Sequence, residues 1–322
     1  MRRLLILSAA ACLVGAHAHA QNSTFTLNAD EAPSDQPWSD PASFSYSKDK
    51  GSKAALSLDA AGKLAWRLGD ATTSTGFGRF VAHRNTATGA QVENYAAEVG
   101  LHFEQSTASG DLPDPNAFYL FHDVSLGYDY KTNFDDEADG CDATPKPAEC
   151  VRSHERSVRL AWTLQPFHLS WERVPAYVGG KLTEQSPDVA YSFGPVITVF
   201  ADDLVDAPTV NGGKPKGTAT GAVGKLSLAL SPRALDYRLV LRGSIQQTEF
   251  FHRPTSRQAG LPEDSTLNRL SLDYDLGPRA FLGEAGWAPS VGVTYTKGDD
   301  PLIGVANRER TVFAFKLAYR GG

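Results

Sequence analysis

The feature that most restricts the fold of this chain is a two-residue alternation of side-chain type, which recurs along most of its length. Leu270, Leu272 and Tyr274, for example, alternate with Ser271 and Asp273. Successive side chains of a β-strand point to opposite faces, so this period indicates strands with one apolar face and one small, polar or charged face. Runs with helical period are few. The sequence therefore predicts an all-β fold.

The strands can be counted backwards from the C-terminal segment. The count is 14, an even number that returns the chain to the side on which it began, and merging two hairpins would give 12 instead. The predicted strands are 53–59, 62–69, 76–84, 92–104, 117–131, 155–165, 167–175, 185–194, 196–203, 219–230, 235–249, 266–276, 288–297 and 309–320.

The first residues have the composition of a secretory signal peptide. Arg2 and Arg3 precede an apolar run over 4–15, and alternating alanines over 16–20 offer cleavage sites. The apolar run is too short to span a membrane as a helix, and no later segment approaches the roughly 20 apolar residues that such a helix needs. We therefore expect an exported chain that starts near Gln21.

The overall charge argues against one class of partner. Of 31 Lys and Arg, two belong to the signal peptide, which leaves 29 against 37 Asp and Glu in the exported chain. A net charge of −8 disfavours nucleic-acid binding, because that activity needs a basic surface.

The connections between the predicted strands are of two kinds. Short proline-containing turns are expected at 165–166, 194–195, 231–234 and 276–279. Long polar loops are expected at 131–155, 176–186, 203–218, 250–266 and 298–308. Long loops at one end and tight turns at the other are typical of outer-membrane barrels, in which the tight turns face the periplasm.

Alternation alone fits two architectures. In a soluble sandwich or lipocalin-like barrel the apolar faces point inward, whereas in a membrane barrel they meet lipid and the charges face the interior. Tyrosine and tryptophan near the ends of the apolar segments favour the membrane, because these side chains form girdles at its interfaces. They are Tyr128, Tyr130, Trp162, Trp171, Tyr274 and Tyr319.

The last twelve residues, TVFAFKLAYRGG, carry a resemblance to a known class. Phe313, Phe315, Leu317 and Tyr319 share one face, opposite small or charged residues, and Arg320 and two glycines follow. This pattern resembles the closing strand of Gram-negative outer-membrane β-barrel proteins. The resemblance implies a closed antiparallel up-and-down transmembrane β-barrel. Its expected parts are the signal peptide (1–20), a polar N-terminal lead-in (21–41) and a single barrel domain (42–322).

In such a barrel the charged faces line the lumen. Eight basic and eight acidic side chains are expected there, and they could either line a water-filled pore or pair with one another and close it. The balance of signs predicts no ion preference. The predicted lumen-lining residues are Lys63, Arg67, Glu98, Glu104, Asp123, Asp129, Arg159, Glu172, Lys225, Asp236, Arg238, Arg242, Asp273, Asp275, Lys316 and Arg320.

His168 and Ser170 form an H-x-S pair within a predicted strand, where an imidazole and a hydroxyl would share a face. The three residues resemble the H-x-S of two lipid-hydrolysing outer-membrane families, the phospholipase A and lipid A deacylase families. The resemblance implies a base and a nucleophile that act on lipid. The strand phase predicts that this pair faces the lumen with Glu172, and a polar lumen lining is the alternative interpretation.

Two cysteines remain after the signal peptide. Cys141 and Cys150 lie in a polar loop of an exported chain, which predicts a disulfide. The acidic residues over 135–142 lack the spacing of a calcium loop. We therefore expect no metal and no other cofactor.

These patterns lead to a ranked set of functions. We expect an outer-membrane channel, porin-like, for passive passage of small polar solutes. The alternatives are a lipid or lipopolysaccharide hydrolase, which would make the protein an enzyme, and a non-conducting structural or binding barrel. The expected partners are outer-membrane lipid, lipopolysaccharide, the barrel-assembly machinery and small polar solutes. The sequence does not indicate the oligomeric state.

Overall fold

The structure is a computed structural model that describes residues 23–28, 41–47, 55–68, 73–86, 92–106, 116–133, 153–178, 181–207, 215–257, 263–276, 286–300 and 305–320. Within these ranges no helix is long and apolar enough to cross a membrane. The strands are β1 (Ser23–Asn28), β2 (Ala42–Ser47), β3 (Ala55–Arg67), β4 (Ser74–Asn85), β5 (Val92–Ser106), β6 (Phe118–Asn133), β7 (Ser153–His168), β8 (Glu172–Arg173), β9 (Tyr177–Val178), β10 (Lys181–Leu182), β11 (Val189–Asp206), β12 (Gly217–Pro232), β13 (Leu239–His252), β14 (Asp264–Asp275), β15 (Gly286–Asp300) and β16 (Val305–Arg320). Three short 3-10 helices, η3 (Leu169–Trp171), η4 (Arg233–Leu235) and η5 (Thr255–Arg257), lie between strands.

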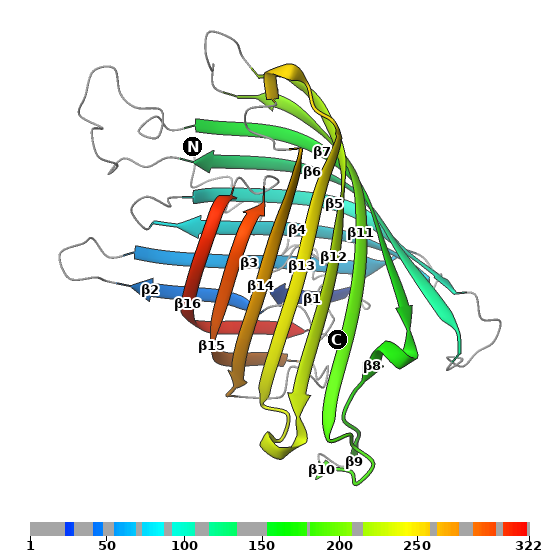
Figure 1. The fold of residues 1–322 in the computed structure, drawn as a ribbon. Helices are drawn as coiled ribbons and strands as arrows, with labels where there is room; N and C mark the ends of the chain where they lie inside the picture. Colours follow the sequence, from blue (N-terminus) through cyan, green and yellow to red (C-terminus); the bar gives the residue numbers. More distant parts are fainter. Residues whose placement is uncertain are drawn as a thin grey trace.

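The long strands form one closed antiparallel sheet (Figure 1). From β2 onwards each long strand pairs with the next long strand of the chain, and β16 returns to pair with β1 and β2. Closure pairs the sheet edges around the ring except where β7 and β11 separate at one end, and paired edges are what a spanning β-structure requires in lipid. The predicted up-and-down barrel is confirmed.

The first strand position of the ring is shared by two chain segments. Asn28 of β1 pairs with Ala61, and Ser43 of β2 pairs with Asp59, so both segments run along β3 in one continuous register. Both also pair with β16. The ring therefore has twelve strand positions, the smaller of the two counts that the sequence left open. Strand β1 lies within the segment that the sequence predicted as a polar lead-in.

Two pairs of predicted strands are single strands in the structure, and a third strand extends through a predicted turn. The segments 53–59 and 62–69 merge into β3, and 185–194 and 196–203 merge into β11. Strand β7 likewise runs through the predicted turn at Gln165-Pro166. The predicted turns at 165–166 and 194–195 are therefore wrong.

Both prolines lie where β7 and β11 separate. The two strands pair from Leu164 and Ile197 towards one end of the barrel and have no mutual partners beyond these residues. Pro166 still pairs with β6, and Pro195 still pairs with β12. A proline lacks the N–H group that a strand donates, so it is tolerated where one side of the strand has no partner.

Ser23 and Arg320 lie at the same end of the ring, which we call the termini end. The predicted long loops at 131–155, 203–218, 250–266 and 298–308 all join strands at the far end, and the predicted turns at 231–234 and 276–279 join strands at the termini end, as the predicted asymmetry requires. The predicted loop at 176–186 is the exception, because it belongs to the connection 169–188 at the termini end. The strands themselves are asymmetric. At the end far from the termini, β11 to β16 continue beyond the apolar band with exposed, outward-facing polar side chains. These include Asp203, Gln247, Glu249, Asn268 and Lys297.

The two faces of the sheet decide between the architectures that the sequence left open. Large apolar side chains are exposed on the outside, such as Leu126, Leu226 and Phe315, whereas charged side chains on the opposite face are buried. A soluble barrel has the reverse arrangement, because water would face the outer surface. The chain thus has the inside-out distribution of outer-membrane β-barrels.

Aromatic side chains border the outward apolar band. Trp66, Phe118, Tyr274 and Trp287 are exposed near the termini end, and Tyr46 and Tyr128 near the other. Trp171 of η3 adds edge contacts with Phe118 and Phe193, at ring-centroid distances of 6.0 and 5.5 Å. Such rings suit the interface between hydrocarbon and water.

Candidate functional site

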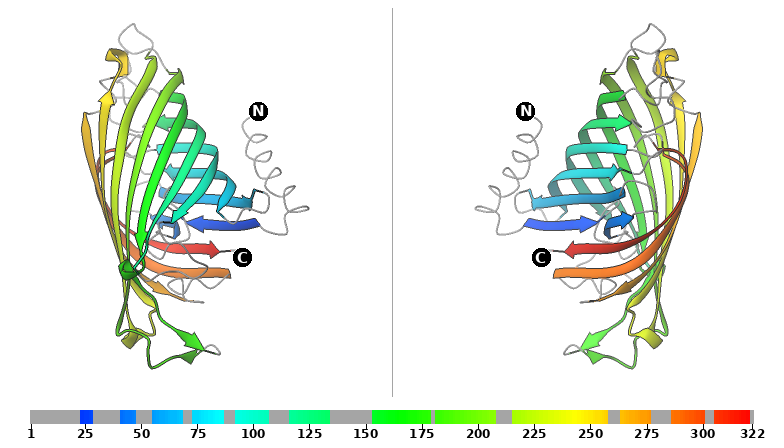
Figure 2. Two further views of the ribbon diagram at one scale, coloured as in Figure 1. Left: turned by 90° about the vertical axis from the view of Figure 1, so that its right-hand side faces the viewer. Right: turned by 90° about the vertical axis from the view of Figure 1, so that its left-hand side faces the viewer.

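The candidate site is the inward face of the barrel, which divides into two walls. Strands β3 to β7 form the N-terminal wall, and β11 to β16 form the C-terminal wall. Viewed from the side, β12 and β13 of the C-terminal wall run in a steeply different direction from β3 and β4, whereas β15 and β16 curve into the direction of β3 (Figure 2). Charged side chains are present on both walls.

The C-terminal wall holds a fully buried cluster of three charges. The Asp273 carboxylate lies 2.6 Å from Nη1 of Arg242 and 2.6 Å from Nζ of Lys316. The three side chains are exposed by 0, 3 and 1%, respectively. They belong to β14, β13 and β16, so the cluster extends across β15.

Gly292 of β15 makes room for this cluster. A Cβ atom at this position would lie 1.9 Å from Oδ1 of Asp273 and 2.6 Å from the carbonyl oxygen of Leu272. The carboxylate therefore occupies the space that a side chain on β15 would take. A buried charge is costly unless it is paired, and the absent side chain lets Asp273 reach Lys316 on the far side of β15.

A second cluster joins the two walls. Arg159 of β7 lies 2.7 Å from Asp129 of β6 and 3.7 Å from Asp202 of β11. Arg257 of η5 reaches into the barrel and donates to Oδ2 of Asp202 at 2.6 Å and to the carbonyl oxygens of Asp202 and Gly217. Beside it, the rings of Phe200 and Phe250 pack edge to face with each other. Both rings belong to a buried cluster with Ala161 and Ala219. This part of the interior is filled by side chains.

The N-terminal wall pairs its charges directly across neighbouring strands. Arg79 bonds to Glu98, and His102 bonds to Asp123, and each pair is opposite in the strand register. Lys63 lies 3.9 Å from Asp123. The side chains of Lys63, Asp123 and His102 are exposed by 18, 14 and 26%. A further pair, His83 with Asp59 at 3.0 Å, lies on the same face.

Other predicted lumen residues occupy different places. Asp236 and Arg238 lie in the turn after η4 and not on a strand, so their predicted strand positions are wrong. Arg67 and Glu104 are exposed near strand ends, and Glu172 lies in the short strand β8. Lys225 is half-buried on the inward face, and Asp275 is buried there. Arg320 pairs with Thr26 in the register of β16 and β1.

The H-x-S pair is a helix cap. His168 pairs with the exposed Phe118, so its side chain is on the outward face, and the prediction that it faces the lumen is wrong. Its Nδ1 accepts from the backbone N–H of Ser170 at 3.1 Å and lies 2.8 Å from the Ser170 hydroxyl. Within the part of the chain that the structure describes, no carboxylate bonds to this imidazole. The pair therefore lacks the third group that orients a catalytic base.

Two other expectations concern cysteines and metals. Cys141 and Cys150 lie outside the described residues, so their disulfide stays a prediction. Among the described side chains, no group of three or more His, Cys, Asp or Glu residues could hold a metal ion.

The comparisons with known proteins locate the chain only broadly. No family model matches it, and no curated protein matches it. One similar solved structure is the β domain of the Bordetella autotransporter BrkA, with 14% identity, a TM-score of 0.43, and coverage of 93% of this chain and 98% of that one. Another is the translocator domain of the autotransporter NalP from Neisseria meningitidis, with 13% identity, a TM-score of 0.35, and coverage of 99% and 94%.

OmpT of Vibrio cholerae, an outer-membrane protein, is also similar, with 11% identity and a TM-score of 0.22 over 93% of this chain and 96% of that one. All three TM-scores are below 0.5. The architecture of this chain therefore rests on its own strand pairing and burial.

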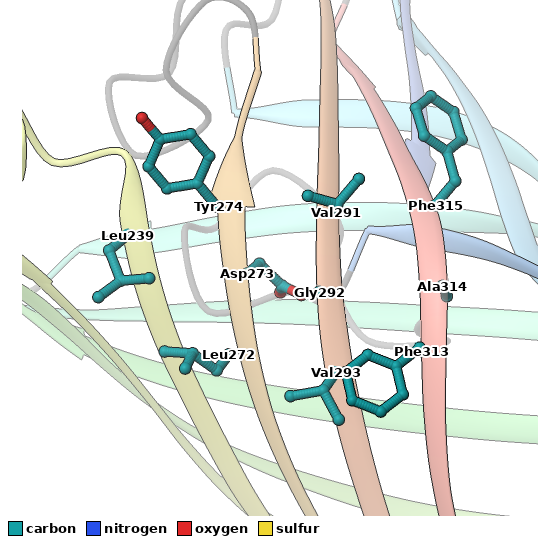
Figure 3. Close-up of a pocket in the computed structure, with 10 residues that line it drawn as sticks. All are labelled: Leu239, Leu272, Asp273, Tyr274, Val291, Gly292, Val293, Phe313, Ala314 and Phe315. Atoms are coloured by element: carbon teal, nitrogen blue, oxygen red, sulfur yellow. The ribbon is translucent and has the colours of Figure 1, made fainter.

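The outward face carries a shallow apolar groove of about 510 Å³ over β13 to β16. In Figure 3, Leu272, Tyr274, Val293 and Phe315 border the groove, while Asp273 points to the other side of the sheet. The groove is part of the apolar band that faces hydrocarbon in a membrane barrel, so no specific ligand is needed to explain it.

Sequence reasoning missed several interior residues. Arg79, His102 and Asp202 have the strand phase of the predicted lumen residues, so the alternation could have found them. Arg257 could not be found in this way, because it belongs to a predicted loop. Strand alternation with Leu239 and Leu241 would place Tyr237 on the outward apolar face, but it is fully buried beside inward-facing residues.

Proposed function

We propose that this protein is an outer-membrane barrel that passes small polar solutes along its N-terminal wall. The supporting observation is the difference in accessibility between the walls. Lys63, Asp123 and His102 remain partly accessible, whereas Asp273 and Lys316 on the C-terminal wall are sealed. A solute that crosses the barrel needs polar groups that water can reach, and the N-terminal wall offers them.

The proposed orientation places the termini end in the periplasm. The exposed polar extensions of β11 to β16 at the other end then project from the cell surface, as the longer outer ends of such barrels do. Lipopolysaccharide and outer-membrane lipid would surround the apolar band, and the barrel-assembly machinery would insert the chain. Export would require cleavage of the segment 1–20.

Conductance in planar bilayers tests the channel directly. The purified protein should give discrete steps, and Lys63→Glu should move the reversal potential in a salt gradient towards cation preference. Lys297→Glu is the matched control, because it makes the same charge change at an exposed, outward-facing position paired with Glu309. An equal shift in both variants would exclude a path beside Lys63.

A second candidate is a non-conducting structural or binding barrel. It is favoured by the burial of the Arg242–Asp273–Lys316 cluster and by the two turn residues, Tyr237 and Arg257, that fill space on the inward face. This candidate predicts correctly folded protein that shows no conductance steps at any voltage. The bilayer recording therefore separates the two functions.

A further inference from the structure

The backbone of the turn between β12 and β13 has an uncommon conformation. Asp236 and Tyr237 both adopt the left-handed region, with φ values of 54° and 56°. Few residues other than glycine do so, and a bulky residue does so only where its surroundings hold it. The turn is closed by backbone bonds from Asp236 to Arg233 and from Tyr237 to Pro232. The conformation at Asp236 ends η4, but it does not explain the one at Tyr237.

The unusual backbone directs the ring of Tyr237 into the barrel. Its side chain is fully buried and packs with Ala190, Ala229 and Val240. These three alternate along their strands with the exposed, outward-facing Val189, Leu228 and Leu241, so they face inward. The ring of Tyr237 therefore lies on the inward face at the termini end, where it is covered and packed against β11 to β13.

A short segment behind the ring holds it in place. We call residues 181–187 the strap. The hydroxyl of Tyr237 donates to the carbonyl oxygen of Pro187, and Leu182 packs against the cluster around the ring. Burial raises the pKa of the Tyr237 hydroxyl above its ordinary value, so the group stays protonated and remains a donor at physiological pH.

Arg233 ties the strap to the same turn. Its guanidinium group donates to the carbonyl oxygens of Thr183 and Glu184, both at 3.3 Å, and of Ser186 at 2.9 Å. The planar group presents several donors in a fixed geometry, so three carbonyl acceptors on one segment hold that segment firmly. The turn therefore carries two side chains, Tyr237 and Arg233, that hold the strap over the inward face.

We propose that the strap narrows the termini-end mouth and sets the upper size limit for solutes, with Tyr237 and Arg233 as the side chains that hold it there. This inference rests on the proposed function. The strain at Tyr237 is consistent with such a role, because a turn that served only to connect two strands has no need of a buried aromatic residue in this conformation. The size limit follows from the width that the strap removes while the buried ring of Tyr237 anchors it, since pore diameter governs which solutes pass.

The test compares Tyr237→Gly with Asp236→Gly. Both substitutions place glycine at a left-handed position and relieve the same backbone strain, but only the first removes the ring. Tyr237→Gly should raise the single-channel conductance about twofold or more and admit larger sugars in liposome swelling, because a wider mouth conducts more. Asp236→Gly should behave as wild type.

Folding is checked by heat-modifiable gel mobility, and Tyr237→Leu replaces Tyr237→Gly if the glycine variant does not fold. Arg233→Gln supplies a second measurement, because a loosened strap should increase the frequency of large openings. If the wild type conducts and the Tyr237 variant has the same conductance and size limit, the inference is overturned and the proposed channel stands. A silent wild type with a conducting variant would support the inference and contradict the proposed channel. Silence in both folded proteins would overturn both.

Discussion

The two walls of the barrel pair their inward-facing charges in different ways. On the N-terminal wall, Arg79–Glu98 and His102–Asp123 are direct cross-strand pairs that occupy opposite register positions. On the C-terminal wall, the Asp273 carboxylate forms ion pairs with two cations, and one of them, Lys316, lies beyond the intervening strand β15. The first arrangement leaves Arg79, His102 and Asp123 partly accessible although Glu98 is buried, whereas the second seals all of its side chains.

One alternating pattern of side chains can therefore produce either an accessible lining of the lumen or a filled interior. Pairs in register keep their charges close to the sheet and leave the space above them accessible. The Asp273 cluster instead needs a strand without a side chain, and Gly292 provides it. The C-terminal wall also receives Tyr237 and Arg257 from turns at its two ends. Passage of solutes, where it occurs, is therefore expected beside the N-terminal wall.

The largest expected effect comes from Asp273→Asn. The change removes the carboxylate charge that two buried cations share, and breaking a buried pair in this way costs about 3–5 kcal/mol. Urea unfolding in detergent micelles, followed by gel mobility, should show this loss. Asp123→Asn on the N-terminal wall is the control and should cost about 1 kcal/mol or less, because its surroundings are partly hydrated. Equal losses would contradict the difference between the walls.

Gly292→Ala should follow in size. The new methyl group would overlap the Asp273 carboxylate and the Leu272 carbonyl oxygen, and such overpacking costs about 1–3 kcal/mol. Gly224→Ala is the matched control, because a Cβ atom there has no heavy atom within 4 Å. The same unfolding measurement should separate the two variants. A neutral Gly292→Ala would mean that Asp273 does not depend on this space.

A smaller effect is expected for the Arg79–Glu98 pair. Glu98→Gln alone should destabilise the barrel by about 1–2 kcal/mol, because Arg79 then loses its carboxylate partner. Adding Arg79→Gln should recover part of this loss, since the buried cation is also removed. A double-mutant cycle measures the coupling. Purely additive losses would show that the register pair contributes nothing as a pair.

The smallest effect concerns alkaline pH. The pKa of Tyr237 is raised by burial, whereas in the unfolded chain tyrosine titrates near pH 10, as is ordinary for this side chain. Its contribution to stability is therefore complete below about pH 10 and declines above it, because the unfolded chain releases this proton more readily. Absorbance titration at 295 nm should show a late component that is smaller by one tyrosine in Tyr237→Phe. An unchanged component in that variant would assign it to other tyrosines.

Much of the architecture could be read from the alternation. The class of fold and the position of Asp273 and Lys316 on the polar faces of their strands follow from side-chain phase, because a strand places every second residue on the same face. The turns at 165–166 and 194–195 could not be predicted correctly. A proline has no N–H donor, and this suits a tight turn and a strand edge without a partner equally well. Only the separation of β7 from β11 distinguishes these cases.

The sequence determined the local period of each strand and the apolar and polar character of its faces, because these depend on neighbouring residues alone. Which face meets water, how many strands close the ring and which charges pair depend on contacts between distant segments. The union of β1 and β2 into one strand position and the inward turn of Tyr237 are of this kind. The tertiary structure decided them, because their stabilising contacts exist only after the ring has closed.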